Sequence, residues 1–311
     1  MTNQPSKFPT DAEVVIVGVG GIVGSMLAYW LAELGQKNII GLEKSTIIPS
    51  DIASTAHASD FVYNTTHDKL GCWATNFSRN FYEENGFFLK KGGLEICRKD
   101  DDARWEELKR KVESGKAFGT NIRLISASEA KEKFPLLDEE SIRGAMWDPD
   151  AGLVTPRSQD VVNFAVETAK ESGSLKTYTD TPAVGFEIEN GRITGVKTDK
   201  GTIKTKKVVI ASGIWGPLMG DLAGVPVPLM PVEHPLLFFG PLPEIQGTEE
   251  LLVYPLLRDQ GNSAYVRDTG RLHGGMLEWG YYEDKDPRLV DPKDIGLSLI
   301  HISEPTRHSI I

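Results

Sequence analysis

The chain of 311 residues is long enough for two domains, and its charged fraction of 25% is ordinary for a globular protein. Its net charge of −10 argues against nucleic acid or an anionic membrane surface as the main partner. The two cysteines form no C-x-x-C pair, so they indicate a reducing, cytoplasmic compartment and no disulfide framework. The polar first residues are untypical of a secretory signal, and no apolar run approaches the length of a membrane span.

The first predicted elements form a compact unit over residues 11–44. Residues 12–17 are an apolar run rich in β-branched side chains, which predicts a buried parallel strand. An apolar helical pattern follows over residues 22–34 and is stopped by Gly35, and a second buried strand over residues 38–42 ends at Glu43. Strand, glycine-rich turn, helix, strand and acid, in this order, predict a dinucleotide-binding βαβ unit.

The glycine cluster between the first strand and the helix departs from the usual spacing. Residues 18–20 begin the pattern G-x-G-x-x-G, but the third glycine falls one residue late, at Gly24. Either the turn carries a one-residue insertion, or Gly21 takes the role of the second glycine. Such glycines let backbone N–H groups approach a pyrophosphate at the positive end of a helix. A glycine-rich turn in another kind of α/β protein is the alternative.

The next third of the chain alternates helices and strands. Aromatic spacing over residues 70–84 predicts a helix packed on the first domain. Residues 87–98 favour strands, with a hairpin at Gly92-Gly93. Residues 100–113 predict a charged helix with one apolar face, and Ser126 with a glutamate three residues later forms a capping box for a short helix.

Turn signals organise the rest of the chain. Residues 156–172 predict a helix, and residues 183–207 alternate around an Asn-Gly turn, which predicts a three-stranded antiparallel meander. Residues 207–211 again predict a buried parallel strand. From residue 232 to about residue 282 the pattern favours antiparallel strands of a second domain.

The last residues do not continue this pattern. Residues 297–307 read LSLIHISEPTR, which resembles the translation of a common sequencing-library adapter. We therefore expect native sequence to stop near Gly296, residues 297–311 to be an artefact, and the chain to be an N-terminal fragment. An ordinary amphipathic tail is the alternative.

A βαβ unit followed much later by a meander and a KVVIASG strand is not the order of a nicotinamide dehydrogenase. The chain resembles the D-amino-acid-oxidase-like FAD-dependent oxidoreductases, and most of all the sarcosine and dimethylglycine dehydrogenase group. The likeness covers nearly all of residues 11–283. Four stretches carry it, namely VVIVGVGGIVGS with GLEK, STAHAS, DPDAGLVTPRS, and ASGIWGPLMGDLAGVPVPLMPVEH, and a weaker match continues through LLRDQGNSAYVRD and GGMLEWGYYE.

This resemblance implies an α/β fold with two domains. A Rossmann-like FAD-binding domain with a β-meander is expected to be discontinuous, formed by residues 1–85 and 150–228. An α+β substrate domain with an antiparallel sheet, truncated at the C-terminus, is expected from residues 86–149 and 229–296.

The resemblance also implies where the flavin lies. Several family members attach the isoalloxazine covalently to a histidine in an S-T-x-H-A setting, which residues 54–58 match, so His57 is the candidate. The usual pattern has Trp before the histidine and Gly after the alanines, whereas Ala56, Ser59 and Asp60 stand here. A histidine that only hydrogen-bonds the FAD is therefore the alternative.

The remaining cofactor contacts follow from the same likeness. Those expected at the pyrophosphate are Gly18, Gly20, Gly21 and Gly24, and Ile22 and Val23 are also expected to bind the cofactor. Glu43 and Lys44 are expected to hold the adenosine ribose, and the backbone of Val184 to contact the adenine. Further contacts are expected from Ser54, Thr55, Ser212, Gly213 and Trp215. For Trp215, a packed aromatic under the meander is the alternative.

A flavin enzyme of this kind needs an anchor for the substrate carboxylate, and the planar fork of a guanidinium suits that role. Arg258 and Arg267 flank Tyr265, which is a candidate for orienting the amine. His234 matches a family histidine at the entry to the substrate domain, although Pro235 follows where the family usually has Gln. The alternative for each is a structural or surface residue. No metal is predicted, because no cluster of ligand residues shows suitable spacing.

The favoured function is oxidative demethylation of an N-methylated glycine, such as dimethylglycine or sarcosine, by hydride transfer to flavin. The partner is then a small anionic amine, and the electron acceptor is not indicated. In the resembled dehydrogenases a C-terminal region binds folate, so tetrahydrofolate would concern only sequence beyond this chain. Two alternatives remain: an amino-acid oxidase of the same fold acting on glycine, proline or a D-amino acid with oxygen, or a non-catalytic FAD-binding module of a larger protein.

Overall fold

The computed structural model describes residues 8–64, 68–281 and 288–293, and the chain divides into two compact units. The sequencing-adapter-like residues 297–311 lie outside the described part. Each unit is discontinuous in sequence. Of the described residues, the first unit comprises 8–59, 156–232 and 289–293, and the second comprises 60–64, 68–155, 233–281 and 288.

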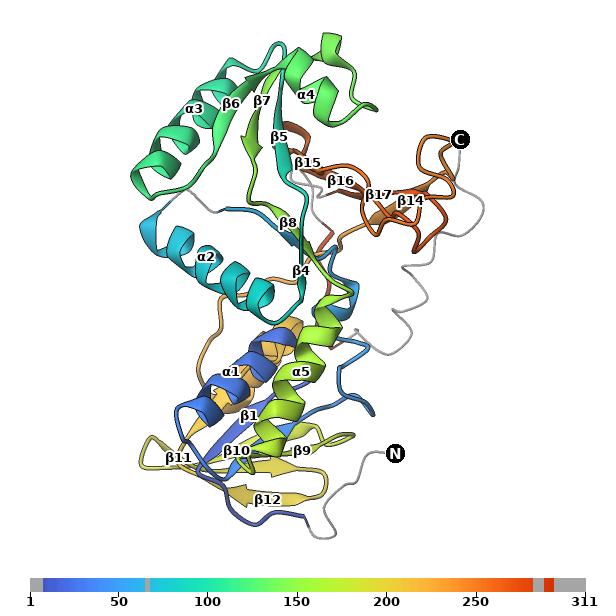
Figure 1. Cartoon of the computed structure of the whole chain (residues 1–311). Helices are drawn as coiled ribbons and strands as arrows, with labels where there is room; N and C mark the ends of the chain where they lie inside the picture. The colour runs from blue at the N-terminus through green and yellow to red at the C-terminus, as the bar shows by residue number, and fades with distance from the viewer. Residues whose placement is uncertain (1–7, 65–67, 282–287, 294–311) are drawn as a thin grey trace. The chain divides into compact units, whose positions relative to one another are not determined.

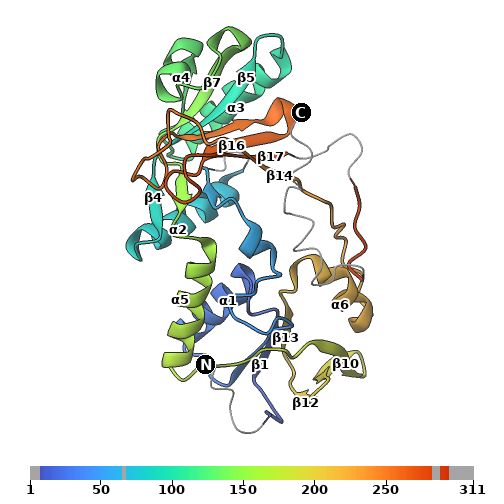
Figure 2. The same ribbon diagram turned by 90° about the vertical axis from the view of Figure 1, so that its right-hand side faces the viewer.

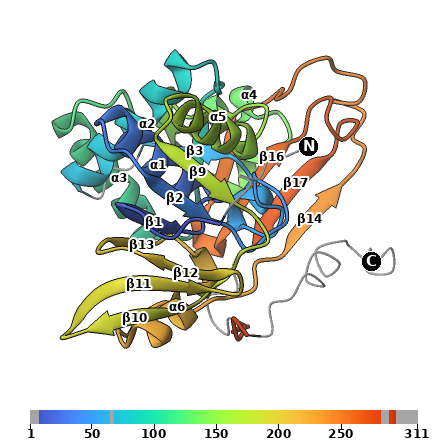
Figure 3. The ribbon, with the colours of Figure 1, turned by 90° about the horizontal axis from the view of Figure 1, so that it is seen from below.

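The first unit is built on a four-stranded parallel sheet, seen from below in Figure 3. Its central strands β1 (Val14–Val17) and β2 (Ile39–Leu42) are buried along their whole length, as expected of apolar runs without alternation. β9 (Leu175–Tyr178) pairs with β2, and β13 (Val208–Ile210) pairs with β1. The predicted βαβ unit is therefore confirmed, and a strand from nearly 200 residues further on completes its sheet.

Two helices cover one face of this sheet. The helix α1 (Ile22–Glu33) has Leu34 as its C-cap, and Gly35 follows with φ +86°, as the sequence predicted. The helix α5 (Ser158–Glu171) lies beside α1 (Figure 1). Their shared core with the sheet includes Val14, Ile16, Ala28, Ile39, Val162, Val166 and Ala169.

The predicted meander covers the other face. Its strands are β10 (Ala183–Glu189), β11 (Arg192–Thr198) and β12 (Gly201–Lys204). The turn residues Asn190 and Gly191 both have positive φ, which fits the tight hairpin that an Asn-Gly pair predicts. Its core with the sheet includes Val15, Val17, Ile40, Phe186, Val196 and Ile203.

The strand expected at residues 207–211 is present as β13, but the prediction that it is buried is wrong. β13 is an edge strand, and Val209 is 36% exposed, because only β1 pairs with it. The chain then enters a short 3₁₀ turn, η3 (Gly213–Trp215), and the helix α6 (Gly216–Ala223), which packs against β10 (Figure 2).

The second unit contains a seven-stranded mixed sheet. Neighbouring strands are antiparallel except at the β15–β5 pair, which is parallel. In spatial order the strands are β14 (Leu236–Phe239), β17 (Leu277–Tyr281), β16 (Ala264–Asp268), β15 (Leu256–Asp259), β5 (Gly93–Arg98), β7 (Ile142–Asp148) and β6 (Arg123–Ser126). The antiparallel strands expected after residue 232 are thus present.

Two helices cover the β5–β7–β6 part of this sheet, one on each side (Figure 1). The helix α3 (Asp102–Ala117) buries Leu108 and Val112, as predicted. The helix α4 (Ala127–Lys133) begins with the predicted cap, since the Ser126 hydroxyl accepts from the Glu129 N–H. Short 3₁₀ turns follow at η2 (Glu139–Ser141) and η4 (Gln260–Asn262).

The hairpin predicted at Gly92-Gly93 is wrong. The strand β4 (Phe88–Lys90) pairs with β8 (Gly152–Val154), which also pairs with β3 (Phe61–Val62), whereas β5 belongs to the large sheet. Gly92 has φ +83°, and a Cβ there would lie 2.0 Å from the Trp147 ring. The glycine therefore turns the chain from one sheet into the other instead of closing a hairpin.

The helix α2 (Lys69–Glu84) matches the predicted helix, but it belongs to the second unit and not to the first. It contacts β4, and it buries Phe81, whereas Trp73 is 60% exposed. Residues 60–85 were expected in the FAD-binding domain, and their pairing with β8 groups them with the second unit instead. None of the helices in the described residues is long and apolar enough to cross a membrane.

Candidate active site

The glycine turn between β1 and α1 packs tightly at Gly20 and Gly24. A Cβ on Gly24 would lie 2.1 Å from the Gly18 carbonyl oxygen, and one on Gly20 would lie 2.5 Å from Glu43 Oε2. A Cβ on Gly21 would meet nothing closer than 3.7 Å. Gly21 is also the N-cap of α1 and has no side chain to cap it, so an anion can approach the positive end of the helix beside Gly21, although the Ile22 N–H already donates to Thr55. This arrangement favours Gly21 in the role of the second glycine.

Glu43, at the end of β2, is fixed against the same turn. Its side chain is 6% exposed, and its two oxygens accept from the N–H groups of Gly20 (2.8 Å) and Ser45 (2.9 Å). Burial raises the pKa of the Glu43 carboxyl, and the two backbone N–H groups act in the opposite direction. The neighbouring Lys44 is exposed, and its Nζ lies 4.8 Å from the centre of the Trp215 ring, within cation–π range.

Buried polar atoms without partners surround this turn. In the described residues, no hydrogen-bond partner is found for Ser212 Oγ or Trp215 Nε1. Leaving a buried donor unpaired costs about 1–3 kcal/mol, so such a group points to a polar ligand or a bound water. Ser212 is a neighbour of Gly18 in the turn, and the Trp215 ring lies beside Lys44. These atoms therefore fit a polar cofactor lying along the turn.

The segment predicted beside the flavin starts close to the same turn. The Ile22 N–H donates to the Thr55 hydroxyl at 3.0 Å, which joins the start of α1 to the 3₁₀ turn η1 (Ser54–His57). The His57 ring is exposed, and its Nε2 lies 3.1 Å from the Asp51 carbonyl oxygen. A carbonyl only accepts, so Nε2 carries the hydrogen in this contact.

Other predicted cofactor residues are more exposed. Val23 is 68% exposed in the first turn of α1, and Val184 is 50% exposed in β10. Ser54 and Gly213 are exposed at the starts of η1 and η3. The structure thus brings the glycine turn, Glu43 and Thr55 together, and it places Val184 in the meander, as the sequence predicted.

Sequence reasoning missed one residue of this region. Arg157, just before α5, donates from Nη2 to the carbonyl oxygens of Ala56 (3.3 Å) and Ala58 (3.1 Å). These two carbonyls flank His57. Arg157 does stand in the stretch DPDAGLVTPRS, but no local signal shows that its side chain reaches residues that lie 100 positions earlier.

In the second unit, the rings of His234 and Tyr265 are stacked with centroids 5.6 Å apart and planes at 12°. Tyr265 also meets Phe61 edge to face, at 5.1 Å between centroids. On the next strand it faces Gly280, where a Cβ would lie 2.0 Å from the Tyr265 ring. Gly280 therefore provides the room in which the tyrosine ring lies.

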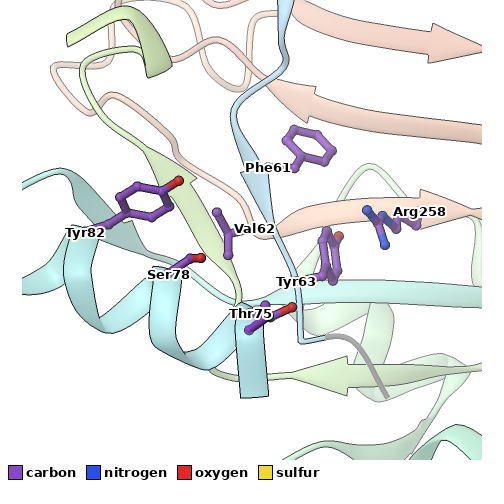
Figure 4. A pocket seen from close by; sticks show the side chains of 8 residues that line it. Phe61, Val62, Tyr63, Thr75, Ser78, Tyr82 and Arg258 are labelled. Carbon is purple, nitrogen blue, oxygen red and sulfur yellow. The ribbon is translucent and has the colours of Figure 1, made fainter. Parts of the chain in front are cut away.

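Arg258 is the cross-strand partner of Tyr265, and its guanidinium lies 4.2 Å from the centre of the Tyr63 ring. It is half-buried, and no carboxylate pairs with it in the described residues. It lines an open pocket with a volume of about 360 Å³, and Figure 4 shows the side chains around that pocket. The lining residues are Phe61, Val62, Tyr63, Ala74, Thr75, Ser78, Tyr82 and Arg258.

Arg267, the other predicted anchor, has a different environment. Its side chain is 2% exposed, and Nε and Nη2 both donate to Glu278 Oε2, at 3.1 and 2.7 Å. Glu278 is its cross-strand partner and is also buried. The charge of Arg267 is therefore already compensated inside the protein, which favours Arg258 over Arg267 as the anchor.

Electrostatics distinguishes His234 from an ordinary surface histidine. Burial lowers the pKa of the His234 imidazole, and the negative charge of Glu278 acts in the opposite direction. The ring is thus held towards its neutral form, which can accept a proton. In the described residues, no group of three or more His, Cys, Asp or Glu side chains is arranged to hold a metal ion.

Comparison with known proteins agrees with this geometry. The family model described as FAD dependent oxidoreductase matches residues 13–301. Human mitochondrial sarcosine dehydrogenase is 28% identical over 293 residues, which cover 90% of this chain and 30% of that protein. The 4-methylaminobutanoate oxidase (formaldehyde-forming) of Paenarthrobacter nicotinovorans is 31% identical over 294 residues, which cover 91% of this chain and 33% of that protein.

Among solved structures, the L-proline dehydrogenase from P. horikoshii is similar with a TM-score of 0.75 and 31% identity. The match covers 87% of this chain and 70% of that one. The chain spans about a third of the length of the two curated relatives.

Proposed function

Because the chain belongs to the family of FAD-dependent oxidoreductases, we propose that the protein oxidises a small N-methylated amino acid at the bond between carbon and nitrogen. Sarcosine and dimethylglycine are the substrates that the sequence resemblance favours. When bound, FAD supplies the two-electron acceptor for a hydride from the carbon next to the amine nitrogen. The protein's own residues must then hold the cofactor, anchor the carboxylate and keep the nitrogen unprotonated.

The first unit supplies groups suited to FAD. The N-terminus of α1 beside Gly21, where a Cβ would meet nothing closer than 3.7 Å, suits a pyrophosphate, and the Glu43 carboxylate at the end of β2 suits a ribose hydroxyl. The unpaired donors Ser212 Oγ and Trp215 Nε1 would gain partners from a polar cofactor. A covalent bond between FAD and His57 is part of the proposal, supported by the exposure of that ring and by the S-T-x-H-A setting.

The observation that carries the substrate proposal is the guanidinium of Arg258. A half-buried cation against an aromatic ring, without a carboxylate partner in the described residues, is suited to bind a carboxylate from outside. Phe61, Tyr63 and Tyr82 give the pocket apolar walls, and Thr75 and Ser78 add hydroxyl groups. Such a pocket suits a small amino acid better than a simple aliphatic amine.

We assign the amine end of the substrate to His234 and Tyr265. The neutral imidazole of His234 is suited to remove the proton that an ammonium substrate carries, which exposes the nitrogen lone pair. The Tyr265 hydroxyl is suited to orient the nitrogen, because its ring is fixed between His234 and Phe61. Arg267 then supports the sheet behind these residues through its pair with Glu278.

The proposal is tested by anaerobic titration of the FAD-loaded protein with sarcosine, dimethylglycine, 4-methylaminobutanoate, glycine and proline. We expect bleaching of the flavin absorbance by one of the N-methylated compounds. Bleaching by glycine or proline alone would favour the amino-acid oxidase alternative. A stable yellow protein that no compound bleaches would favour the non-catalytic module. Hydrogen peroxide production in air then separates an oxidase from a dehydrogenase.

Variants of Arg258 test the anchor. Arg258→Met keeps the length of the side chain and removes the charge, so we expect substrate affinity to fall roughly 10- to 100-fold, as for a lost charge-assisted hydrogen bond. Arg258→Lys should recover part of the loss. Arg123, which forms an exposed pair with Glu129, provides the control Arg123→Met. Unchanged affinity in Arg258→Met would mean that the carboxylate binds elsewhere.

A further inference from the structure

Arg157 holds the backbone on both sides of His57 with a single nitrogen. Its Nη2 donates to the carbonyl oxygen of Ala56 at 3.3 Å and to that of Ala58 at 3.1 Å. The Ala56 carbonyl belongs to the peptide group just before His57, and the Ala58 carbonyl lies one residue beyond it, so the backbone is held on both sides of residue 57. Hydrogen bonds from a charged donor are about twice as strong as neutral ones.

Residues 53–56 of the same loop are held by hydrogen bonds to the start of α1 and within the loop. The Thr55 hydroxyl accepts from the Ile22 N–H at the start of α1, and the Ala56 N–H donates to the Ala53 carbonyl at 2.9 Å. Arg157 ties the other end of the segment to the start of α5. The contacts of Thr55 with α1 and of Arg157 with the Ala56 and Ala58 carbonyls thus hold residues 55–58 between the two helices that cover the parallel sheet.

The imidazole of His57 depends on this backbone for its direction. The ring is exposed, so little packing restrains it, and Nε2 contacts the Asp51 carbonyl of the same loop. A change in the backbone between Ala56 and Ala58 would rotate the bond from Cα to Cβ of His57 and move the ring with it. The side chain of Arg157 is thus placed to control the ring without touching it.

We propose that Arg157 is a positioning residue, which fixes the backbone at His57 and so sets the direction of its ring for the bound FAD. This inference rests on the proposed function and adds a residue that lies outside the histidine motif. The flexible ammonium of lysine is a poorer match for two carbonyls than a planar guanidinium is. Arg157→Lys should therefore recover only part of the effect of Arg157→Met.

The test uses hydrogen–deuterium exchange of the peptide covering residues 51–60, in the full chain without added FAD. We expect exchange about tenfold faster in Arg157→Met than in the wild type, as for local opening with one or two hydrogen bonds lost. Arg157→Lys should lie between them, and the control Arg123→Met should equal the wild type. Wild-type exchange in both Arg157 variants would overturn the inference. If Arg157→Met does not fold, Arg157→Lys alone decides, and equality with the wild type overturns it.

A second measurement tests the link to His57. After FAD loading and acid precipitation, flavin fluorescence in the pellet reports covalently bound cofactor, and the rate of FAD release reports the rest. We expect Arg157→Met to lower the covalent fraction severalfold or, if no bond forms in the wild type, to speed FAD release about tenfold. Faster exchange in Arg157→Met with unchanged FAD retention would overturn the inference that Arg157 sets the direction of the His57 ring. The exchange result stands even if no substrate bleaches the flavin, so the two proposals can fail separately.

Discussion

The imidazole of His234 lies parallel to the ring of Tyr265, with planes 12° apart and centroids separated by 5.6 Å. Stacking removes one face of the imidazole from water, and the neighbouring Glu278 is itself buried. Water solvates a charged imidazolium far better than an aromatic face does, so the stack favours the neutral ring. A structural contact thereby prepares the protonation state that the proposed chemistry requires.

The first prediction concerns acid stability. Burial lowers the folded-state pKa of His234 below its ordinary value of 6.5, so below that pH the unfolded chain binds a proton that the folded chain resists. Stability should therefore fall as the pH drops from 6.5 towards the folded-state pKa. His234→Gln should flatten this part of the curve in thermal melts between pH 5 and 7.5. The exposed His273 gives the control His273→Gln, and equal slopes in the two variants would contradict the prediction.

The second prediction concerns the buried ion pair. Arg267→Met leaves the Glu278 carboxylate buried without its partner, and we expect a loss of about 3–5 kcal/mol in the free energy of unfolding. The double variant with Glu278→Leu should recover much of this loss, because no charge then remains buried. At the exposed pair Arg123–Glu129, Arg123→Met should cost at most about 1 kcal/mol. Urea denaturation measures all three, and a small effect of Arg267→Met alone would show that water reaches the pair.

The third prediction separates two glycines of the turn. Gly24→Ala forces a methyl group to within 2.1 Å of the Gly18 carbonyl, so we expect a loss of about 1–3 kcal/mol despite the better helix propensity of alanine. Gly21→Ala meets only ordinary contacts and should change stability by no more than about 0.5 kcal/mol. Weaker FAD binding in Gly21→Ala with unchanged melting would support the open face of Gly21 as the pyrophosphate contact.

The fourth prediction concerns Glu43. The Glu43 carboxylate accepts hydrogen bonds from the backbone N–H groups of Gly20 and Ser45. In Glu43→Gln, the NH₂ group of the amide faces one of these N–H groups, so one buried donor loses its acceptor. We expect a loss of about 1–3 kcal/mol in unfolding free energy at pH 7. The variant also no longer buries a charged group, which stabilises the folded state, because burial disfavours the charged form of this carboxyl and raises its pKa. Unfolding at pH 7 shows which effect is larger, and a more stable variant would mean that desolvation dominates.

Local signals predicted much of the fold. Three predictions that depend on only a few neighbouring residues are confirmed: the Asn190-Gly191 turn, the Ser126 cap and the end of α1 before Gly35. The βαβ unit was equally readable, because its strands are short apolar runs and its turn is rich in glycine. These features depend on the chain's immediate neighbours, which a sequence shows directly.

Features that depend on distant partners were not predictable in the same way. Two glycines in a row look alike whether they close a hairpin or, as at Gly92, turn the chain into a second sheet. Arg267 resembled Arg258 in sequence, but only the register opposite Glu278 shows that its charge is already paired. Arg157 and Ala58 are 99 positions apart, and nothing in either segment indicates that they meet.

The pairing of β1 with β13 also has a consequence for synthesis. The first strand leaves the ribosome early, yet its neighbour on one side lies beyond residue 207. The ribosome adds roughly 5–20 residues per second. At that rate, translation of the intervening residues 60–155 of the second unit takes about 5–20 s. During this time the nascent chain exposes an apolar edge with no partner to close it. Chaperone occupancy should therefore be greatest on ribosomes paused before that point, and it should fall once the late strand has emerged.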